Sequence, residues 1–260
     1  MQDKPLAALA PWLVATHRQR HTVSAAGWEA LLQTAEQAYA VQQEVGAALG
    51  WFTTGQPPGC WKSGGASRAA VLTHAPLAPA GVRHSPADFG DVCLHTPGIE
   101  AEIALRLGCD VTPAMAAQLT VDTAPALVDA LTVAIEVVDS RWQEAGQAPA
   151  LLRLADFQSH GALALGAWLP YVAHAARDWS TQRCEVHIGT QAPVVRTGTL
   201  PLGEPAWLLP AWLQHVTRHG DTLPAGSVVT TGSWVGVLPA RRGDTATVEF
   251  AGIGVTRLRL

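Results

Sequence analysis

The sequence predicts an α+β protein, in which a helical N-terminal part precedes a mixed sheet of barrel-like or rolled shape. One observation is a Pro-free stretch at residues 24–49, rich in Ala, Gln and Glu, which favours a long helix. The other is a series of short apolar stretches from Gly98 onward, separated by glycines. These stretches show few regular βαβ alternations, which favours a rolled sheet over a doubly wound one. We therefore divide the chain into a helical region with a loop, 1–85, and a β-rich core, 86–260.

The helical part is expected to contain two elements. One or two short helices should occupy residues 4–20, with a break at Pro11. The longer helix should begin at the N-cap residue Ser24 and end before Gly50. Its apolar residues recur at helical spacing, so we expect it to pack on the main body of the protein.

A loop-like segment at residues 55–65, marked by prolines and glycines, follows the helical part. It contains Lys62, between Trp61 and a Gly-rich turn, where the side chain could either point into a cleft or lie in solvent. The next stretch, 66–97, contains four prolines and no regular pattern. A stretch of this length without regular structure is often a functional loop or lid.

The remainder of the chain is dominated by predicted strands, with glycines at the turns between them. Apolar and β-branched patterns predict strands at 99–107, 131–139, 160–166, 184–188, 193–197, 227–231, 245–250 and 253–259. Helices are expected between some of these strands, at 113–119, 123–130 and 204–218.

The composition argues against two classes of partner. The chain has 260 residues, a formal net charge of −4 and no basic patch, which argues against nucleic acid as the main partner. Its four cysteines form no C-x-x-C pair, as is typical of reduced thiols in the cytoplasm. We find no secretory signal and no transmembrane segment, so a cytoplasmic protein without a membrane partner is expected. The ten tryptophans are compatible with an oligomer interface.

Three glutamates stand out on two of the predicted strands. Glu100 and Glu102 would project side by side from one face of the strand at 99–107. Glu136 lies within the apolar strand at 131–139, where an ionised carboxylate is costly unless it is paired or binds a metal. Three carboxylates without Cys or His suit a hard cation such as Mg²⁺ or Mn²⁺. The alternative for the Glu-x-Glu pattern is a solvated strand face.

Other motifs carry less information. The chain has no G-x-S-x-G nucleophile elbow, no phosphate-binding loop and no G-x-G-x-x-G after a strand. The segment from Asp156 to His160 separates two regular elements. Its Asp156 and Ser159 could bind a substrate or could cap a turn.

Taken together, these residues resemble the 2-keto-4-pentenoate hydratase and 4-oxalocrotonate decarboxylase family within the fumarylacetoacetate hydrolase superfamily. The sharpest match is Ile99-Glu100-Ala101-Glu102-Ile103-Ala104-Leu105, followed by Ala134-Ile135-Glu136-Val137-Val138-Asp139-Ser140-Arg141. Weaker matches are Ala38-Tyr39-Ala40-Val41-Gln42, Asp88-Phe89-Gly90, Gly226-Ser227-Val228-Val229-Thr230-Thr231-Gly232 and Arg242-Gly243-Asp244.

The resemblance implies a fold and a set of site residues. The fold would be the β-roll of the fumarylacetoacetate hydrolase C-terminal domain type. Glu100, Glu102 and Glu136 would hold Mg²⁺ or Mn²⁺, Lys62 and Asp156 would act in catalysis, and Ser159 and Phe89 would contact the substrate. The resemblance also implies a cytoplasmic homo-oligomer that degrades aromatic compounds.

The branch of the family is indicated by the spacing of the third acid. Glu136 lies five residues before Arg141, as in the hydratase branch, whereas the acylpyruvase branch resembles Asp-x-x-x-Arg. Two segments depart from the family pattern, at residues 63–67 and at Phe157, where an Asn is usual. The Phe removes an amide and adds bulk.

We therefore expect a metal-dependent lyase that adds water to a 2-hydroxy-2,4-dienoate, similar to 2-oxopent-4-enoate hydratase. The alternative reaction is decarboxylation of a 2-oxo-dienedioate, which would use the same metal and the same enolate. A further alternative is a non-catalytic subunit in complex with a related hydratase or decarboxylase.

Overall fold

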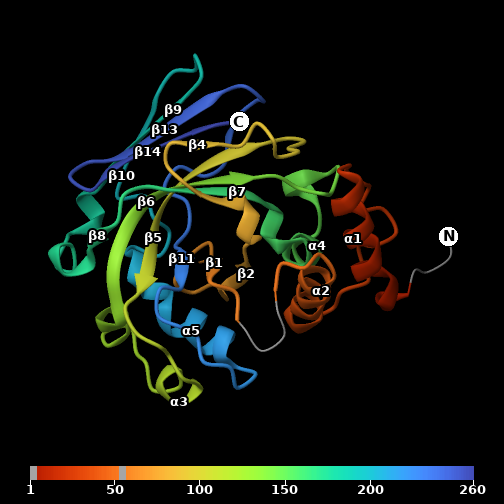
Figure 1. Cartoon of the computed structure of the whole chain (residues 1–260), viewed down its shortest axis with the longest axis horizontal. Helices are drawn as coiled ribbons and strands as arrows, with labels where there is room; N and C mark the ends of the chain where they lie inside the picture. The colour runs from red at the N-terminus through yellow and green to blue at the C-terminus, as the bar shows by residue number, and fades with distance from the viewer. Residues whose placement is uncertain (1–4, 53–56) are drawn as a thin grey trace.

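Two mixed β-sheets form the body of the protein. The computed structural model describes residues 5–52 and 57–260. In these residues the larger sheet has nine strands in the order β2-β1-β11-β5-β6-β7-β3, with β12 beside β5 and β8 beside β6. The smaller sheet has the order β10-β9-β13-β14-β4 and lies at the top of Figure 1. The predicted α+β class with a curled, mixed sheet is confirmed.

The elements have the following bounds. The strands are β1 Cys60–Gly64, β2 Thr73–Pro76, β3 Val82–His84, β4 Ala87–Asp88, β5 Gly98–Leu107, β6 Val128–Val138, β7 His160–Leu165, β8 Leu169–Pro170, β9 Arg183–Ile188, β10 Val194–Thr197, β11 Val228–Thr230, β12 Leu238–Pro239, β13 Thr245–Phe250 and β14 Gly254–Arg259. The helices are α1 Leu9–Gln19, α2 Ala35–Ala48, α3 Pro113–Ala116, α4 Ala150–Ala155 and α5 Leu209–Thr217. Each of the eight predicted strands is present, with small differences at its ends.

The helical part differs from the prediction in both of its elements. Pro11 does not break α1, because it lies in the first turn, where its missing N–H has no intrahelical partner to lose. The long helix begins at Ala35 and not at Ser24, because Thr34 caps it. The Thr34 side chain accepts from the backbone N–H of Gln37, and the Gln37 side chain accepts from that of Thr34, which makes a capping box. The predicted start at residue 4 lies outside the described residues.

The predicted loops contain four strands. β1 lies within the segment predicted as a loop at 55–65, of which residues 55–56 lie outside the described part. β2, β3 and β4 lie within the stretch predicted to be irregular. β1 pairs in parallel with β11, far along the chain, and this distant partner leaves no local pattern. The large sheet thus takes three strands from before residue 85, and the predicted domain division there stays a proposal.

The predicted helices in the core are shorter than expected. The helix predicted at 123–130 is wrong, since a single 3-10 turn at Ala124–Leu127 leads directly into β6. The helix predicted at 113–119 is reduced to α3. The helix predicted at 204–218 is present as a 3-10 turn at Pro205–Leu208 followed by α5. In the described residues, α4 was the only α-helix without a predicted counterpart.

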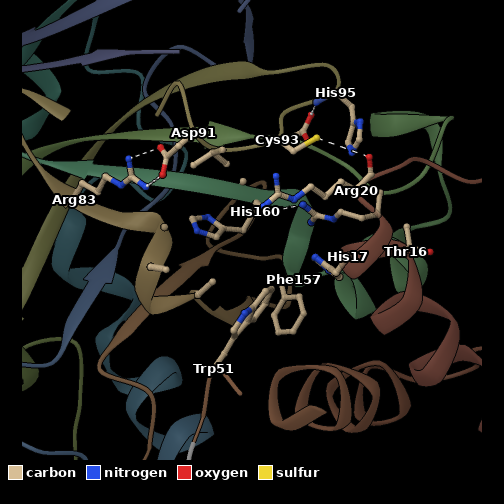
Figure 2. Close-up of a pocket in the computed structure, with 17 residues that line it drawn as sticks. Thr16, His17, Arg20, Trp51, Arg83, Asp91, Cys93, His95, Phe157 and His160 are labelled. Atoms are coloured by element: carbon tan, nitrogen blue, oxygen red, sulfur yellow. Dashed lines mark hydrogen bonds and ion pairs between the residues drawn. The ribbon is translucent and has the colours of Figure 1, made fainter. Parts of the chain in front are cut away.

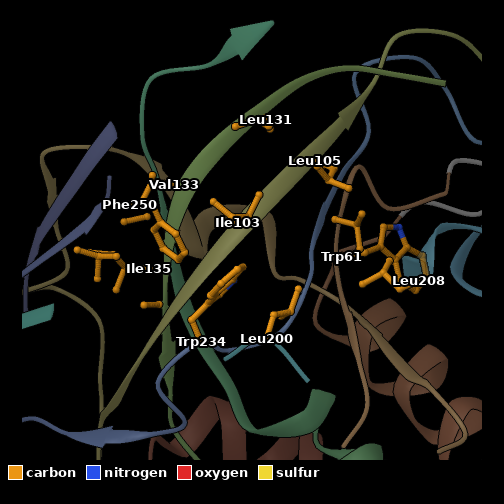
Figure 3. Packing of buried hydrophobic residues seen from close by; sticks show 14 of the residues in the cluster. Trp61, Ile103, Leu105, Leu131, Val133, Ile135, Leu200, Leu208, Trp234 and Phe250 are labelled. Carbon is orange, nitrogen blue, oxygen red and sulfur yellow. The ribbon is translucent and has the colours of Figure 1, made fainter. Parts of the chain in front are cut away.

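The main apolar core lies against one face of β5 and β6. Ile103 of β5 and Val133 and Ile135 of β6 point toward Phe250 and Trp234, as Figure 3 shows. The opposite face of the same two strands carries the three glutamates, because side chains alternate along a strand. A second apolar cluster joins α1, α2 and α4, which lie together on the right of Figure 1. No helix of the described residues is long and apolar enough to cross a membrane.

Candidate metal centre and active site

Three carboxylates meet on the face of β5 and β6 that is opposite to the main core. Glu100 and Glu136 are direct cross-strand partners in the antiparallel pair of β5 and β6, and Glu102 follows on the same face. One oxygen from each carboxylate lies within 4.8 Å of the others. The pairing of the two strands therefore brings the three predicted metal ligands together. The solvated-face alternative does not fit Glu102 and Glu136, whose exposed fractions are 2% and 0%.

Burial makes this cluster electrostatically unfavourable without a cation. Burial, together with the neighbouring Glu136 carboxylate, raises the pKa of Glu100 to about 7. Burial and both neighbouring carboxylates raise the pKa of Glu102 to about 8. Burial alone would raise the pKa of Glu136 as well, but Lys62 and His160 hold that pKa below its ordinary value. Glu136 is therefore the carboxylate that is most firmly kept ionised.

Lys62 supplies the positive charge that lies next to these carboxylates. Its Nζ donates to Oε1 of Glu136 at 2.6 Å and to the carbonyl of Gln158 at 3.3 Å. Burial would lower the pKa of Lys62, but the three carboxylates outweigh this and raise the pKa. The side chain is thus an ammonium that is largely buried, with 11% of it exposed, and the pairing of β1 with β11 holds its strand in place.

The donor set fits a divalent metal ion. Oε2 of Glu136 is buried and has no hydrogen-bond partner among the described residues, although Oε1 has two. One ammonium cannot balance three ionised carboxylates, so full ionisation of Glu100 and Glu102, whose pKa values are raised, calls for a further cation. Oxygen ligands of this kind are those that Mg²⁺ and Mn²⁺ prefer.

A cavity of about 640 Å³ opens beside the cluster. Lys62, Glu100 and Glu102 line it on one side. Arg153 and Arg196 also line it, and the sequence analysis did not identify either of them. Their positions follow from α4 and from the pairing of β10 with β9, which no local pattern indicates. The cavity thus combines a carboxylate cluster with three cationic side chains.

Asp156 lies in a buried ion pair and does not line this cavity. Its Oδ1 accepts from Nε of Arg141 at 2.6 Å, and its Oδ2 accepts from the backbone N–H of Arg141 at 3.0 Å. The exposed fraction of its side chain is 0%. Burial alone would raise the pKa of Asp156, but Arg141 and His17 outweigh it and hold the pKa below its ordinary value. Its predicted catalytic role has no support from this placement.

Ser159 and Phe89 are also absent from the lining of this cavity. Ser159 is buried in the turn before β7, where its carbonyl accepts from the backbone N–H of Asp139 at 2.7 Å. Phe89 is fully buried in the main core, under the guanidinium of Arg83. Of the seven site residues predicted, the structure therefore brings together Lys62 and the three glutamates.

The turn that contains Ser159 is held by Arg141. Phe157, Gln158 and Ser159 all have positive φ values, of 51°, 53° and 59°. Non-glycine residues in this region cost about 1 kcal/mol or more each. Arg141 donates to the carbonyls of both Asp156 and His160, which flank the turn. This clamp places the Gln158 carbonyl where it accepts from Lys62.

Comparison with known proteins identifies a matching family. Residues 70–260 match the family described as Fumarylacetoacetate (FAA) hydrolase C-terminal. No curated protein sequence matches the chain.

Solved structures share the fold over all or most of the chain. One is 4-oxalocrotonate decarboxylase from Pseudomonas putida G7, complexed with calcium and acetate, with 22% identity and a TM-score of 0.79 over 100% of this chain and 98% of that one. The same enzyme complexed with magnesium and adipate gives the same identity and score over 98% and 96%. A more distant structure is 2-hydroxyhepta-2,4-diene-1,7-dioate isomerase from Mycobacterium marinum, with 16% identity and a TM-score of 0.54 over 77% and 73%. The family match covers most of the chain, and the chain therefore belongs to the fumarylacetoacetate hydrolase superfamily.

Proposed function

We propose that the protein is a divalent-metal-dependent lyase that acts on a small 2-oxo acid. The observation that carries this proposal is the cluster of Glu100, Glu102 and Glu136 with Lys62. Lys62, Glu100 and Glu102 line one cavity, and Glu136 is buried behind it. The three glutamates would hold Mg²⁺ or Mn²⁺. When bound there, the ion would act as a Lewis acid for the enolate form of the substrate.

The chain's own residues would bind and orient the substrate. Lys62 is a buried ammonium at the cavity wall, so it can attract a carboxylate or an enolate oxygen and can deliver a proton from Nζ. Arg153 and Arg196 offer further charge for a carboxylate. Arg153 Nε donates to the carbonyl of Ala148 at 3.0 Å, which leaves its terminal nitrogens free to turn toward a ligand.

Decarboxylation of a 2-oxo-dienedioate, which reacts in its 2-oxo-3-enedioate form, is the reaction that this set of charges favours. A dicarboxylate needs a second cationic contact, and the two arginines supply positive charge beyond Lys62. The bond to the departing carboxylate breaks, CO₂ leaves, and the electron pair enters the conjugated enolate. A proton then converts the enolate into the product. The whole-chain likeness to a decarboxylase agrees with this choice at the level of the fold.

Hydration of a 2-hydroxy-2,4-dienoate is the second candidate, favoured by the spacing of Glu136 and Arg141 in the sequence. It would use the same enolate, with water adding across the distal double bond. A cytoplasmic homo-oligomer in the degradation of aromatic compounds, alone or in complex with a related enzyme, belongs to the same proposal.

The test compares two substrates with the same purified protein. 2-Oxohex-3-enedioate and 2-hydroxypenta-2,4-dienoate are each incubated with Mg²⁺ and with EDTA, and the products are identified by CO₂ release and by mass. We expect Mg²⁺-dependent release of CO₂ from the dicarboxylate. A gain of one water by the monocarboxylate would select hydration instead.

Two variants test the metal assignment and the contact to the second carboxylate of the substrate. Glu102→Gln should abolish turnover and leave the fold intact, and activity near that of the wild type would contradict the metal assignment. Arg196→Gln should reduce turnover of the dicarboxylate more than that of the monocarboxylate. Metal binding without turnover of either compound would favour the non-catalytic subunit.

A further inference from the structure

His160 contacts the carboxylate cluster from outside the cavity of the proposed substrate. Its Nδ1 lies 3.0 Å from Oε1 of Glu136, and its side chain is 3% exposed. It does not line the cavity that contains Lys62. It lines a separate cavity of about 350 Å³ between α1 and the sheet, which Figure 2 shows. His160 can therefore reach the proposed chemistry only through Glu136.

The hydrogen bonds at Glu136 fix which oxygen remains free. An ionised carboxylate only accepts hydrogen bonds, so the imidazole must carry its hydrogen on Nδ1 and donate it to Oε1. Lys62 donates to the same oxygen at 2.6 Å. Oε2 receives no hydrogen bond although it is buried. Two donors thus hold Oε1, and Oε2 remains available as the ligand atom.

The backbone of His160 is held in place by a hydrogen bond and by close packing of the next residue. Its carbonyl accepts from Nη1 of Arg141 at 2.8 Å. The next residue, Gly161, lies so close to β6 that an added Cβ would be 2.9 Å from the carbonyl oxygen of Val137. A glycine at this position lets β7 begin against the bulge in β6, and this contact sets where the imidazole stands.

We propose that His160 is a positioning residue that orients Glu136 for metal binding. The proposal rests on the metal site proposed above. Partners of this kind restrict a ligand to one rotamer, and their removal typically lowers metal affinity by roughly 10- to 100-fold. With Lys62 as the sole donor, the Glu136 carboxylate could still rotate about that single hydrogen bond.

The experiment measures the Kd for Mn²⁺ by the electron paramagnetic resonance signal of free Mn²⁺. His160→Leu removes the donor at similar bulk, and we expect its Kd to rise by roughly 10- to 100-fold. His160→Asn places an amide N–H where Nδ1 stands, and we expect it to restore an affinity near that of the wild type. His95→Leu is the matched control, because His95 lines the same second cavity without contacting Glu136, and its Kd should not change.

A double-variant cycle separates positioning from packing. If His160 acts through Glu136, then His160→Leu should have no further effect on the Mn²⁺ affinity of Glu136→Gln. Equal losses in both backgrounds would overturn the proposal, as would an unchanged Kd in a folded His160→Leu. If metal-free His160→Leu does not show a cooperative thermal transition, His160→Ala is measured in its place. A wild type that binds no Mn²⁺ would instead refute the metal site itself, and the role of His160 with it.

Discussion

The buried ion pair between Asp156 and Arg141 allows a sharp test of what Asp156 does. The Asp156→Ala variant removes a carboxylate that accepts two hydrogen bonds from Arg141, at 2.6 Å and 3.0 Å. The remaining guanidinium is only 8% exposed. Removing one partner of a buried pair costs about 3–5 kcal/mol, because the other charge stays buried without compensation. This is a large share of a typical free energy of unfolding of about 5–15 kcal/mol.

A second variant separates the cost of an unpaired Arg141 charge from the loss of the other hydrogen bonds that Arg141 makes. Arg141→Met combined with Asp156→Ala removes both charges, so it should be less destabilised than Asp156→Ala alone. It should not recover fully, because Arg141 also donates to the carbonyls of Asp156 and His160.

Urea unfolding of the metal-free proteins measures these differences. The pKa of Asp156 is lowered in the folded state, so its carboxylate stabilises the protein above its unfolded pKa of about 3.9. The advantage of the wild type over Asp156→Ala should therefore be constant near neutral pH and should shrink as the pH falls below about 3.9 toward the folded pKa. A loss of less than about 1 kcal/mol near neutral pH would refute the buried-pair argument.

Three further predictions concern the metal, a cap and a close contact. Mg²⁺ at about 100 times its Kd should stabilise the wild type by about 2.7 kcal/mol in thermal unfolding, and Glu136→Gln should lose most of this gain. Thr34→Ala removes the capping box of α2 and should cost about 1 kcal/mol in urea unfolding, whereas Thr34→Ser should cost little. Gly161→Ala places a Cβ 2.9 Å from the carbonyl oxygen of Val137 and should cost about 1–3 kcal/mol, which differential scanning calorimetry would detect as a lower Tm.

The carboxylate cluster could be predicted from the sequence because its information is local. Glu100 and Glu102 are two residues apart on one strand, and Glu136 interrupts an otherwise apolar strand. Strand alternation alone places Glu100 and Glu102 on one face. Glu136 stands out because an ionised carboxylate is costly within an apolar strand. The register that joins Glu100 to Glu136 needed the structure.

The resemblance implied that Lys62 belongs to the site, but the contacts around the cluster depend on distant pairing and could not be predicted from the residues themselves. Lys62 lies on a short strand whose neighbours are β11 and β2, and prolines and glycines around it favour a loop. The resemblance implied a catalytic role for Asp156, and nothing in the sequence showed that Arg141 would pair with it. His160 had no signal beyond its position next to Ser159.

The structure explains how Phe157 is accommodated at a position where the resembling family usually has Asn. Its ring is 1% exposed and lies 5.0 Å from that of Trp51, measured between ring centroids, within the apolar cluster of α1, α2 and α4. The added bulk therefore points into the helical layer and not into the cavity beside Lys62. The neighbouring Gln158 contributes its backbone carbonyl to Lys62, and a carbonyl does not depend on residue type. The turn thus ties the helical part of the chain to the carboxylate cluster, and a change in the packing of Phe157 would shift a hydrogen-bond acceptor of the buried ammonium.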